Sequence, residues 1–185
     1  MIPPRTTVFT IGHGARPIET FLQLLQGAGV RRVVDVRTAP GSRRHPQFGK
    51  DALSRTLEGH GIAYDWEQEL GGFRKPRPDS RHTALRNAGF RGYADHMETE
   101  GFRRARDRLV QAAGDTPTAC MCAESLWWRC HRRLLSDSLV AAGCEVLHIM
   151  EGGRQEPHHL TGAARIVDGE VIYDLPEGQG ELLAE

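Results

Sequence analysis

Five short runs of apolar and β-branched residues recur along the first 150 positions of this chain, and they constrain the fold more than any other feature. The runs cover residues 7–11, 32–36, 62–66, 118–122 and 144–150. Each is too short for a helix, and the segments between them carry apolar residues at helical spacing, such as Ile18, Phe21, Leu22 and Leu25. Strands that alternate with helices form βαβ units. The pattern therefore predicts an α/β fold, a three-layer α/β/α arrangement around a mostly parallel sheet of about five strands.

The length of 185 residues favours a single domain over residues 1–185, with its core over about 7–150. After that core, Asp168 and Gly169 separate two short β-rich runs, 164–167 and 170–174, as in a two-residue hairpin. We therefore expect a C-terminal β-hairpin extension over about 157–175. Residues 71–87 are rich in Gly, Pro and Arg and lack an apolar period, which predicts a long loop.

The chain carries 24 Lys and Arg against 24 Asp and Glu, so its formal net charge is zero. A neutral chain exerts no long-range attraction on nucleic acid or acidic membranes, so any basic site has to be a local patch.

The N-terminus lacks the apolar segment of a signal peptide, and no apolar run reaches the length of a membrane span. We therefore expect a cytoplasmic protein without a membrane partner, whose four cysteines are reduced thiols.

Residues 117–135, PTACMCAESLWWRCHRRLL, hold the densest group of chemically active side chains. A predicted strand ends there at Cys122, and a loop and a helix over about 127–142 follow. The start of a helix offers unpaired backbone N–H groups and the positive end of the helix dipole. Such a junction binds anions and lowers the pKa of a thiol placed in it. The sequence therefore places the functional site at this junction.

Other polar side chains follow the other predicted strands at the same sheet edge, where ligands of parallel α/β proteins bind. His13 follows the first strand, and Arg37, Arg43 and Arg44 follow the second. Because an unperturbed imidazole titrates near neutrality, His13 is a candidate acid or base. The arginines after the second strand are candidates for contact with an anion.

Cys122 has two interpretations. It is either a small buried hydrophobe at a strand end, or a thiolate stabilised by the following helix and by Arg129, Arg132 or His131. Glu124 opposes a very low thiol pKa if it lies close, and it is itself a candidate general acid or base. Cys120 faces the same side of the strand but lies deeper, so we assign it to the core.

The tryptophans and arginines of this segment also have two interpretations. Arg129 and Arg132, with Trp128, could hold phosphates and stack on bases, or they could form a solvated helix face. Arg91 and Tyr93 close the long loop and could reach the same cleft. A metal site would use Cys122, Cys130 and His131 with His13 or His45. Because Cys130 and His131 are neighbours on the predicted helix and point in different directions, we expect neither a metal nor a cofactor.

Six motifs in order resemble the domain of unknown function 488 family over about residues 8–148. They are TIGH at 10–13, VDVR at 34–37, SRR and PQF at 42–48, ELGG at 69–72, FRGY at 90–93, and MCAE with WRCHR at 121–132. The resemblance implies a compact three-layer α/β domain in which the Cys-Glu and Arg-Cys-His-Arg segments matter, and it implies no particular activity. Gly14 stands where we would expect a serine. A cysteine after a strand also resembles rhodaneses and cysteine phosphatases, but the loop lacks their glycines, so that analogy extends to architecture only.

These observations lead to one main hypothesis: an enzyme whose polar, arginine-rich cleft binds an anionic ligand, either nucleotide-like or nucleic acid. Cys122, Glu124 and His13 are its candidate reactive groups. The candidate ligand-binding residues are Arg37, Arg43, Arg44, Arg91, Tyr93, Trp128, Arg129, His131 and Arg132. The alternatives are a non-catalytic nucleic-acid-binding module, a metal-dependent site, and thiol chemistry of the rhodanese kind.

Overall fold

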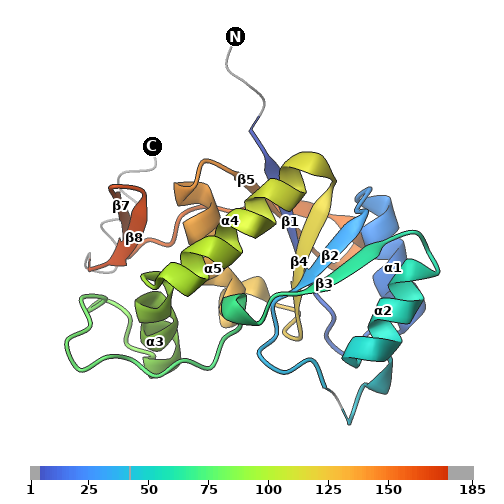
Figure 1. The fold of residues 1–185 in the computed structure, drawn as a ribbon, viewed down its shortest axis with the longest axis horizontal. Coiled ribbons are helices and arrows are strands. Elements are labelled where there is room, and N and C mark those ends of the chain that lie inside the picture. Colours follow the sequence, from blue (N-terminus) through green and yellow to red (C-terminus); the bar gives the residue numbers. More distant parts are fainter. Residues whose placement is uncertain (1–4, 42, 175–185) are drawn as a thin grey trace.

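The computed structural model describes residues 5–41 and 43–174. Within these residues, six strands form a central sheet in the order β3-β2-β4-β1-β5-β6, with helices on both of its faces (Figure 1). The strands are β1 (Thr7–Gly12), β2 (Arg32–Asp35), β3 (Ala63–Trp66), β4 (Thr118–Cys122), β5 (Glu145–Ile149) and β6 (Gln155–Pro157). The first five are parallel, and β6 runs antiparallel to β5. The predicted α/β fold and its five strands are confirmed, whereas the three-residue β6 carries no apolar period that would have revealed it.

The helices divide between the two faces of the sheet. On one face lie α1 (Ile18–Gly27) and α2 (Lys50–Glu58), and on the other lie α3 (Ala88–Met97), α4 (Glu100–Asp115) and α5 (Arg132–Ala141). Alternate strand residues pack against the two layers. Val33 belongs to the apolar cluster that includes Phe21 of α1, and Val34 to the cluster that includes Phe102 of α4. The strands are therefore buried on both sides, as their near-continuous apolar sequences indicate.

Helix α3 was not predicted, because Gly89 and Gly92 interrupt its apolar period. The side chain of Asn87 caps the helix by accepting a hydrogen bond from the backbone N–H of Phe90 at 3.1 Å. A Cβ atom at Gly92 would lie 2.2 Å from the carbonyl oxygen of Arg74, so close packing against the loop requires glycine here. The loop that precedes α3 contains no helix or strand over residues 71–87, as predicted.

The predicted helix over about 127–142 is divided into two parts. A 3₁₀ turn covers Trp127–Arg129, and α5 begins at Arg132. Cys130 between them has an extended backbone, with φ −132° and ψ 173°. Cys130 therefore precedes the helix instead of lying on it.

A two-stranded hairpin, β7 (Ala164–Val167) and β8 (Glu170–Tyr173), follows the central sheet. Its turn residues Asp168 and Gly169 have φ of 51° and 79°, which is the backbone that a two-residue hairpin turn needs. The predicted hairpin is confirmed. Tyr173 is fully buried in the same apolar cluster as α4 and α5, so the hairpin is packed onto the domain core.

The neighbouring strands β1 and β4 are followed by helices on opposite faces of the sheet, α1 on one side and α5 on the other. This arrangement opens a crevice beyond their carboxyl ends, where open α/β sheets bind ligands. Across the described residues, no helix is both long and apolar enough to cross a membrane.

Candidate active site

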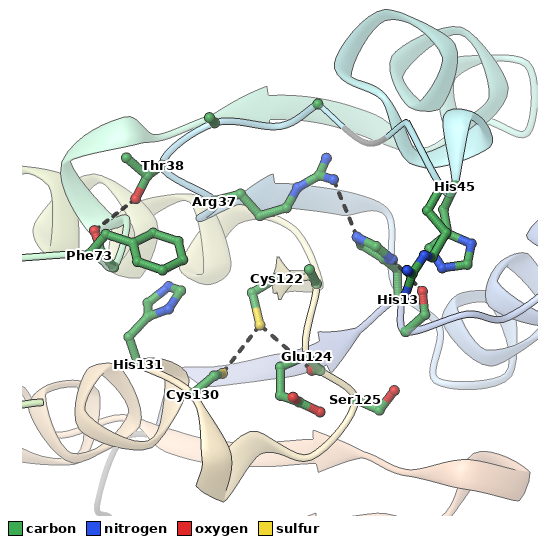
Figure 2. Close-up of a pocket in the computed structure, with 16 residues that line it drawn as sticks. His13, Arg37, Thr38, His45, Phe73, Cys122, Glu124, Ser125, Cys130 and His131 are labelled. Carbon is green, nitrogen blue, oxygen red and sulfur yellow. Dashed lines mark hydrogen bonds between the residues drawn. The ribbon is translucent and has the colours of Figure 1, made fainter. Parts of the chain in front are cut away.

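A cleft of about 730 Å³ lies at the carboxyl ends of β1, β2 and β4 (Figure 2). The cleft thus lies at the edge of the sheet where the sequence predicted the functional site. The side chains around it come from four loops, which are far apart in the sequence. They include His13, Arg37, Thr38, Arg44, His45, Phe73, Cys122, Glu124, Ser125, Cys130 and His131.

Two sulfur atoms lie at the floor of the cleft. The Sγ of Cys122, at the end of β4, lies 3.3 Å from the Sγ of Cys130 (Figure 2). Both are free thiols; Cys122 is buried and Cys130 is partly exposed. The seven residues between them turn back through the 3₁₀ turn, so a spacing that fits no common redox or zinc motif still produces a close pair.

The guanidinium of Arg132 lies beneath this pair and is 1 % exposed. Its Nε donates a hydrogen bond to Cys122 Sγ at 3.0 Å, and its backbone N–H, at the start of α5, donates to Cys130 Sγ at 3.4 Å. The remaining guanidinium nitrogens donate to the hydroxyl of Thr10 and to the carbonyl oxygens of Glu124 and Ser125. Among residues 5–41 and 43–174, no carboxylate forms an ion pair with Arg132.

A buried arginine remains charged, so it needs a negative partner nearby. The sulfurs are the groups in contact with Arg132 that can become anionic. The hydrogen bond from the Cys122 thiol and the charge of Arg132 lower the pKa of Cys130 to about 6. Burial, together with donation of its proton to Cys130, raises the pKa of Cys122 well above the ordinary value. These opposite directions favour Cys130 as the thiolate of the pair and Cys122 as the thiol.

His13 and Arg37 form one wall of the cleft. Asp35, which is fully buried, accepts from Arg37 Nε at 2.9 Å and from Nη2 at 2.5 Å, so the charge of Arg37 is already paired. His13 Nδ1 donates to the Gly14 carbonyl at 2.8 Å, and its Nε2 lies 3.3 Å from Arg37 Nη1. Burial, with a further contribution from Arg37, lowers the pKa of His13 to about 4. His13 thus lines the cleft as a neutral ring with both nitrogens in hydrogen bonds.

His131 forms part of the opposite wall. Its Nε2 donates to the carbonyl oxygen of Val36 at 3.0 Å, and burial lowers its pKa to about 4. A Cβ atom at Gly72 would lie 3.0 Å from His131 Nδ1, so glycine leaves room for the ring. Beside it, Phe73 is 96 % exposed with φ of 59°, a left-handed backbone that a bulky residue rarely adopts (Figure 2). An exposed aromatic ring thus lies at the mouth of the cleft.

Glu124 contributes its main chain to the site as well as its side chain. Its carbonyl oxygen accepts from Arg132, while its exposed carboxylate accepts from the backbone N–H of Leu126 at 3.1 Å. A Cβ atom at Gly12 would lie 1.8 Å from that carbonyl oxygen, so glycine is required where β1 passes the loop. Gly14 has φ of 55°, and a Cβ atom there would lie 2.2 Å from Ser125 Oγ. The space next to position 14 is therefore filled by the Ser125 hydroxyl.

The remaining candidate ligand-binding residues are spread over different parts of the molecule. Arg44 is exposed and lines the cleft, whereas Arg43, Trp128 and Arg129 are exposed but lie outside its lining. Arg91 and Tyr93 belong to α3 and hold loops in place. Arg91 donates to the Leu85 carbonyl at 3.3 Å, and the buried Tyr93 hydroxyl donates to the Leu70 carbonyl at 2.9 Å.

A buried chain of hydrogen bonds leads from Arg132 across β1 and β5 and back to Asp137 of the same helix, α5. Because arginine can only donate, Thr10 Oγ1 accepts from Arg132 at 3.2 Å and gives its own proton to His148 Nδ1 at 2.7 Å. His148 Nε2 then donates to His158 Nδ1 at 2.9 Å, and His158 Nε2 donates to Asp137 at 2.8 Å. Burial lowers the pKa of His148 to about 2, which keeps its ring neutral. Trp127 is stacked on that ring at 4.1 Å and is therefore part of the interior.

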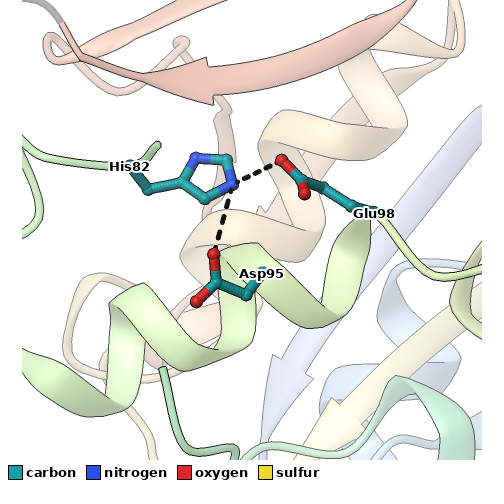
Figure 3. Close-up of side chains that lie close together, drawn as sticks. All are labelled: His82, Asp95 and Glu98. Carbon is teal, nitrogen blue, oxygen red and sulfur yellow. Dashed lines mark hydrogen bonds and ion pairs between the residues drawn. The ribbon is translucent and has the colours of Figure 1, made fainter. Parts of the chain in front are cut away.

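A second cluster, His82, Asp95 and Glu98, has three possible metal-ligand atoms within 4.8 Å of one another (Figure 3). Its hydrogen bonds fit an ion-pair clamp better than a metal site. His82 Nδ1 accepts from the backbone N–H of Tyr173 at 3.3 Å, so Nε2 carries the proton that it donates to Glu98 at 3.0 Å. Arg77 and Arg81 pair with the same Glu98 carboxylate. The cluster joins α3 to the C-terminal hairpin.

Fold and site together define the class: a three-layer α/β protein with a paired-cysteine cleft at the switch point of its sheet. The profile of the family described as Domain of unknown function DUF488 matches residues 17–139, which is more than half of the chain. The chain therefore belongs to the DUF488 family, as its motifs indicated. The matched segment contains Arg37, Cys122, Cys130 and Arg132, whereas His13 precedes it. No curated protein and no solved structure matches the chain.

Sequence reasoning named Cys130 in a metal alternative and in the Arg-Cys-His-Arg segment, but it missed the place of Cys130 beside Cys122. A signal was present, since Cys130 stands two residues before Arg132 at the start of a helix, where a thiol pKa is lowered. Thr38, Ser125 and Phe73 were also missed as cleft residues. They lie in loops whose paths no local sequence pattern determines.

Proposed function

We propose that this protein is an enzyme whose reactive group is the Cys130 thiolate, hydrogen-bonded by the Cys122 thiol, acting as a nucleophile on a small anionic substrate. One observation carries the proposal: the buried Arg132 contacts both sulfurs and has no carboxylate partner among the described residues. A thiolate is the reactive form of cysteine, and a cation that stabilises it in an open cleft is how proteins activate one. The proposal requires reduced thiols, which agrees with the expected cytoplasmic location.

The substrate class follows from the charges around the cleft. Arg44 is exposed at its edge, whereas the charge of Arg37 is paired with Asp35. Arg44 thus supplies the cation for an anionic group of the substrate, and Phe73 supplies an apolar surface at the mouth. The Glu124 carboxylate lies on the same cleft and is the candidate to move protons to and from the leaving group.

Alkylation rates test the proposal, with mass spectrometry to locate the modified residue. We expect rapid alkylation at Cys130 with an apparent pKa near 6, since Cys120 and Cys144 are buried with raised pKa values. Cys130→Ser should abolish the fast reaction. The matched pair Cys122→Ser and Cys122→Ala should differ, because serine keeps a hydroxyl donor to the thiolate and alanine does not.

Two reagents of similar size test the preference for an anion. Relative to neutral iodoacetamide, we expect anionic iodoacetate to gain rate in the wild type and to lose that gain in Arg44→Ala. An ordinary apparent pKa of about 8.5, or a fast reaction that persists in Cys130→Ser, would contradict the proposed nucleophile. Equal loss of rate for both reagents in Arg44→Ala would contradict the anionic substrate.

A further inference from the structure

The two sulfurs differ in the way that a thiol-exchange pair requires. Cys130 is the more exposed and is ionised, so it is placed to attack a substrate in the cleft. Cys122 is 3 % exposed and keeps its proton, 3.3 Å behind the nucleophile. Their sulfurs need to approach by only about 1.3 Å to reach disulfide bonding distance. The loop between them contains bends and a single 3₁₀ turn, without an α-helix or a strand.

We propose that Cys122 and Cys130 form a dithiol–disulfide exchange centre that reacts with small, carboxylate-bearing disulfides and thiols. This inference rests on the proposed function, because it uses the same Cys130 thiolate and the same anion-binding cleft. It adds the substrate class and gives Cys122 a chemical part, as the thiol that resolves the intermediate.

The reaction balances without a further oxidant. The Cys130 thiolate attacks one sulfur of a substrate disulfide, RSSR; a Cys130–S–S–R bond forms, the substrate S–S bond breaks, and RS⁻ leaves. Cys122 then gives up its proton and attacks Cys130 Sγ, forming the Cys122–Cys130 disulfide and expelling the second RS⁻. Two electrons pass from the protein to the substrate. The Cys122 proton and one proton from solvent convert both leaving groups to RSH.

Arg132 determines which direction of this exchange is favoured. In the reduced protein the charge of Arg132 is balanced by the nearby Cys130 thiolate, which accepts from the Arg132 backbone N–H, whereas a disulfide carries no charge and leaves the buried guanidinium without that anion. The reduced form is therefore stabilised, which makes the disulfide a strong oxidant. A thiol with a pKa of about 6 is about nine-tenths ionised at pH 7, and this favours the reduced form by about tenfold over an unperturbed thiol. The favoured direction is thus oxidation of small thiols by the protein disulfide.

The test is equilibration of the full chain at pH 7 in mixtures of reduced and oxidised glutathione, followed by acid quenching, alkylation and peptide mass mapping. We expect a Cys122–Cys130 disulfide in the wild type at high oxidised glutathione. Cys122→Ser should stop at a mixed disulfide between Cys130 and glutathione, because the resolving thiol is missing. In Arg132→Gln the protein disulfide should form at about a tenfold lower ratio of oxidised to reduced glutathione, since the reduced form loses its stabilisation.

Each result has a separate meaning. Wild type that accumulates only the mixed disulfide would overturn the exchange centre while leaving rapid alkylation, and hence the proposed function, in place. An unchanged glutathione ratio in Arg132→Gln would overturn the charge argument. If Arg132→Gln fails to fold, the comparison of wild type with Cys122→Ser still decides whether Cys122 resolves the intermediate. Cys144→Ser is the matched control, because Cys144 is buried outside the cleft, and it should behave like the wild type.

Discussion

Acidification should unfold this protein, because three histidines are held neutral inside it. His13 and His131 have their pKa lowered to about 4, and His148 to about 2, each chiefly by burial. In the unfolded chain each ring titrates near 6.5. Because the folded pKa values lie below the unfolded value, the unfolded chain binds more protons in acid. The stability that these neutral rings contribute is therefore present above pH 6.5 and is lost as the pH falls below it.

The size of the effect follows from these pKa values. Between pH 8 and pH 5, each ring costs about 2 kcal/mol of unfolding free energy, so the three together cost about 6 kcal/mol. That is comparable with the whole stability of an ordinary domain. The pKa values of His82 and His96 are also lowered, mainly by burial, and they add to the effect in the same direction. Ordinary carboxyl groups titrate below this range, so they do not account for a loss of stability at pH 5 to 6.

Urea denaturation at several pH values, followed by tryptophan fluorescence and circular dichroism, measures this dependence. Between pH 6 and 5 the unfolding free energy should fall by at least about 3.5 kcal/mol, because each of the three unfolded rings takes up nearly one proton over this interval. The matched variant is His131→Gln, whose amide nitrogen can donate to the Val36 carbonyl in place of Nε2. Over the same interval the unfolding free energy of this variant should fall by about 1.2 kcal/mol less than that of the wild type. The reasoning would be refuted if the unfolding free energy of the wild type fell by less than the equivalent of one proton per molecule. It would also be refuted if His131→Gln showed the same dependence on pH as the wild type.

Three further outcomes are expected. Gly12→Ala should lower the unfolding free energy by at least about 3 kcal/mol in urea denaturation, since its Cβ would lie 1.8 Å from a carbonyl oxygen. Gly27→Ala, with nothing within 4 Å, should be neutral or gain up to about 1 kcal/mol, and a loss at both glycines would argue against close packing as the cause. Tyr173→Phe removes the 2.7 Å hydrogen bond to buried Asp137 and should cost about 1–3 kcal/mol in thermal or urea unfolding. Arg44→Ala should change stability by less than about 0.5 kcal/mol while slowing alkylation by iodoacetate, and a destabilised variant would instead assign Arg44 a structural role.

The sheet could be predicted because its information is local. A run such as residues 32–36 is apolar on both faces and only a few residues long, which is the signature of a buried parallel strand. The edge that carries the site followed from topology alone, because parallel strands end together. Helix α3 was missed for an equally local reason. Its stability comes from the Asn87 cap and from Gly92 packing against the loop at Arg74, and neither produces an apolar period.

Some residues that line the cleft could be named from the sequence, such as Arg37, Cys122 and Glu124, but the charge balance of the cleft could not be predicted. Arg37 and Arg132 both follow a predicted strand, and the sequence does not show which of them has a carboxylate partner. In the structure the guanidinium of Arg37 is paired with a buried carboxylate, whereas that of Arg132 donates to the sulfur of Cys122. This difference depends on which side chains from other elements face each guanidinium. No spacing within a single segment encodes it.

The choice of sulfur as the partner of Arg132 is the strongest argument that this site is reactive. A carboxylate in the same position would remain ionised throughout the physiological pH range and would keep the guanidinium permanently paired. A thiol pair with one proton provides the same charge balance, but its anion is a nucleophile and can be consumed by alkylation or oxidation. The guanidinium also donates to Thr10, the first member of the buried chain through His148 and His158 to Asp137, so its position does not depend on the sulfurs alone. Repeated turnover at Cys130 would consume and restore the thiolate in each cycle. An arginine with hydrogen bonds beyond the sulfurs is suited to this, because Arg132 can stabilise each new thiolate from the same position.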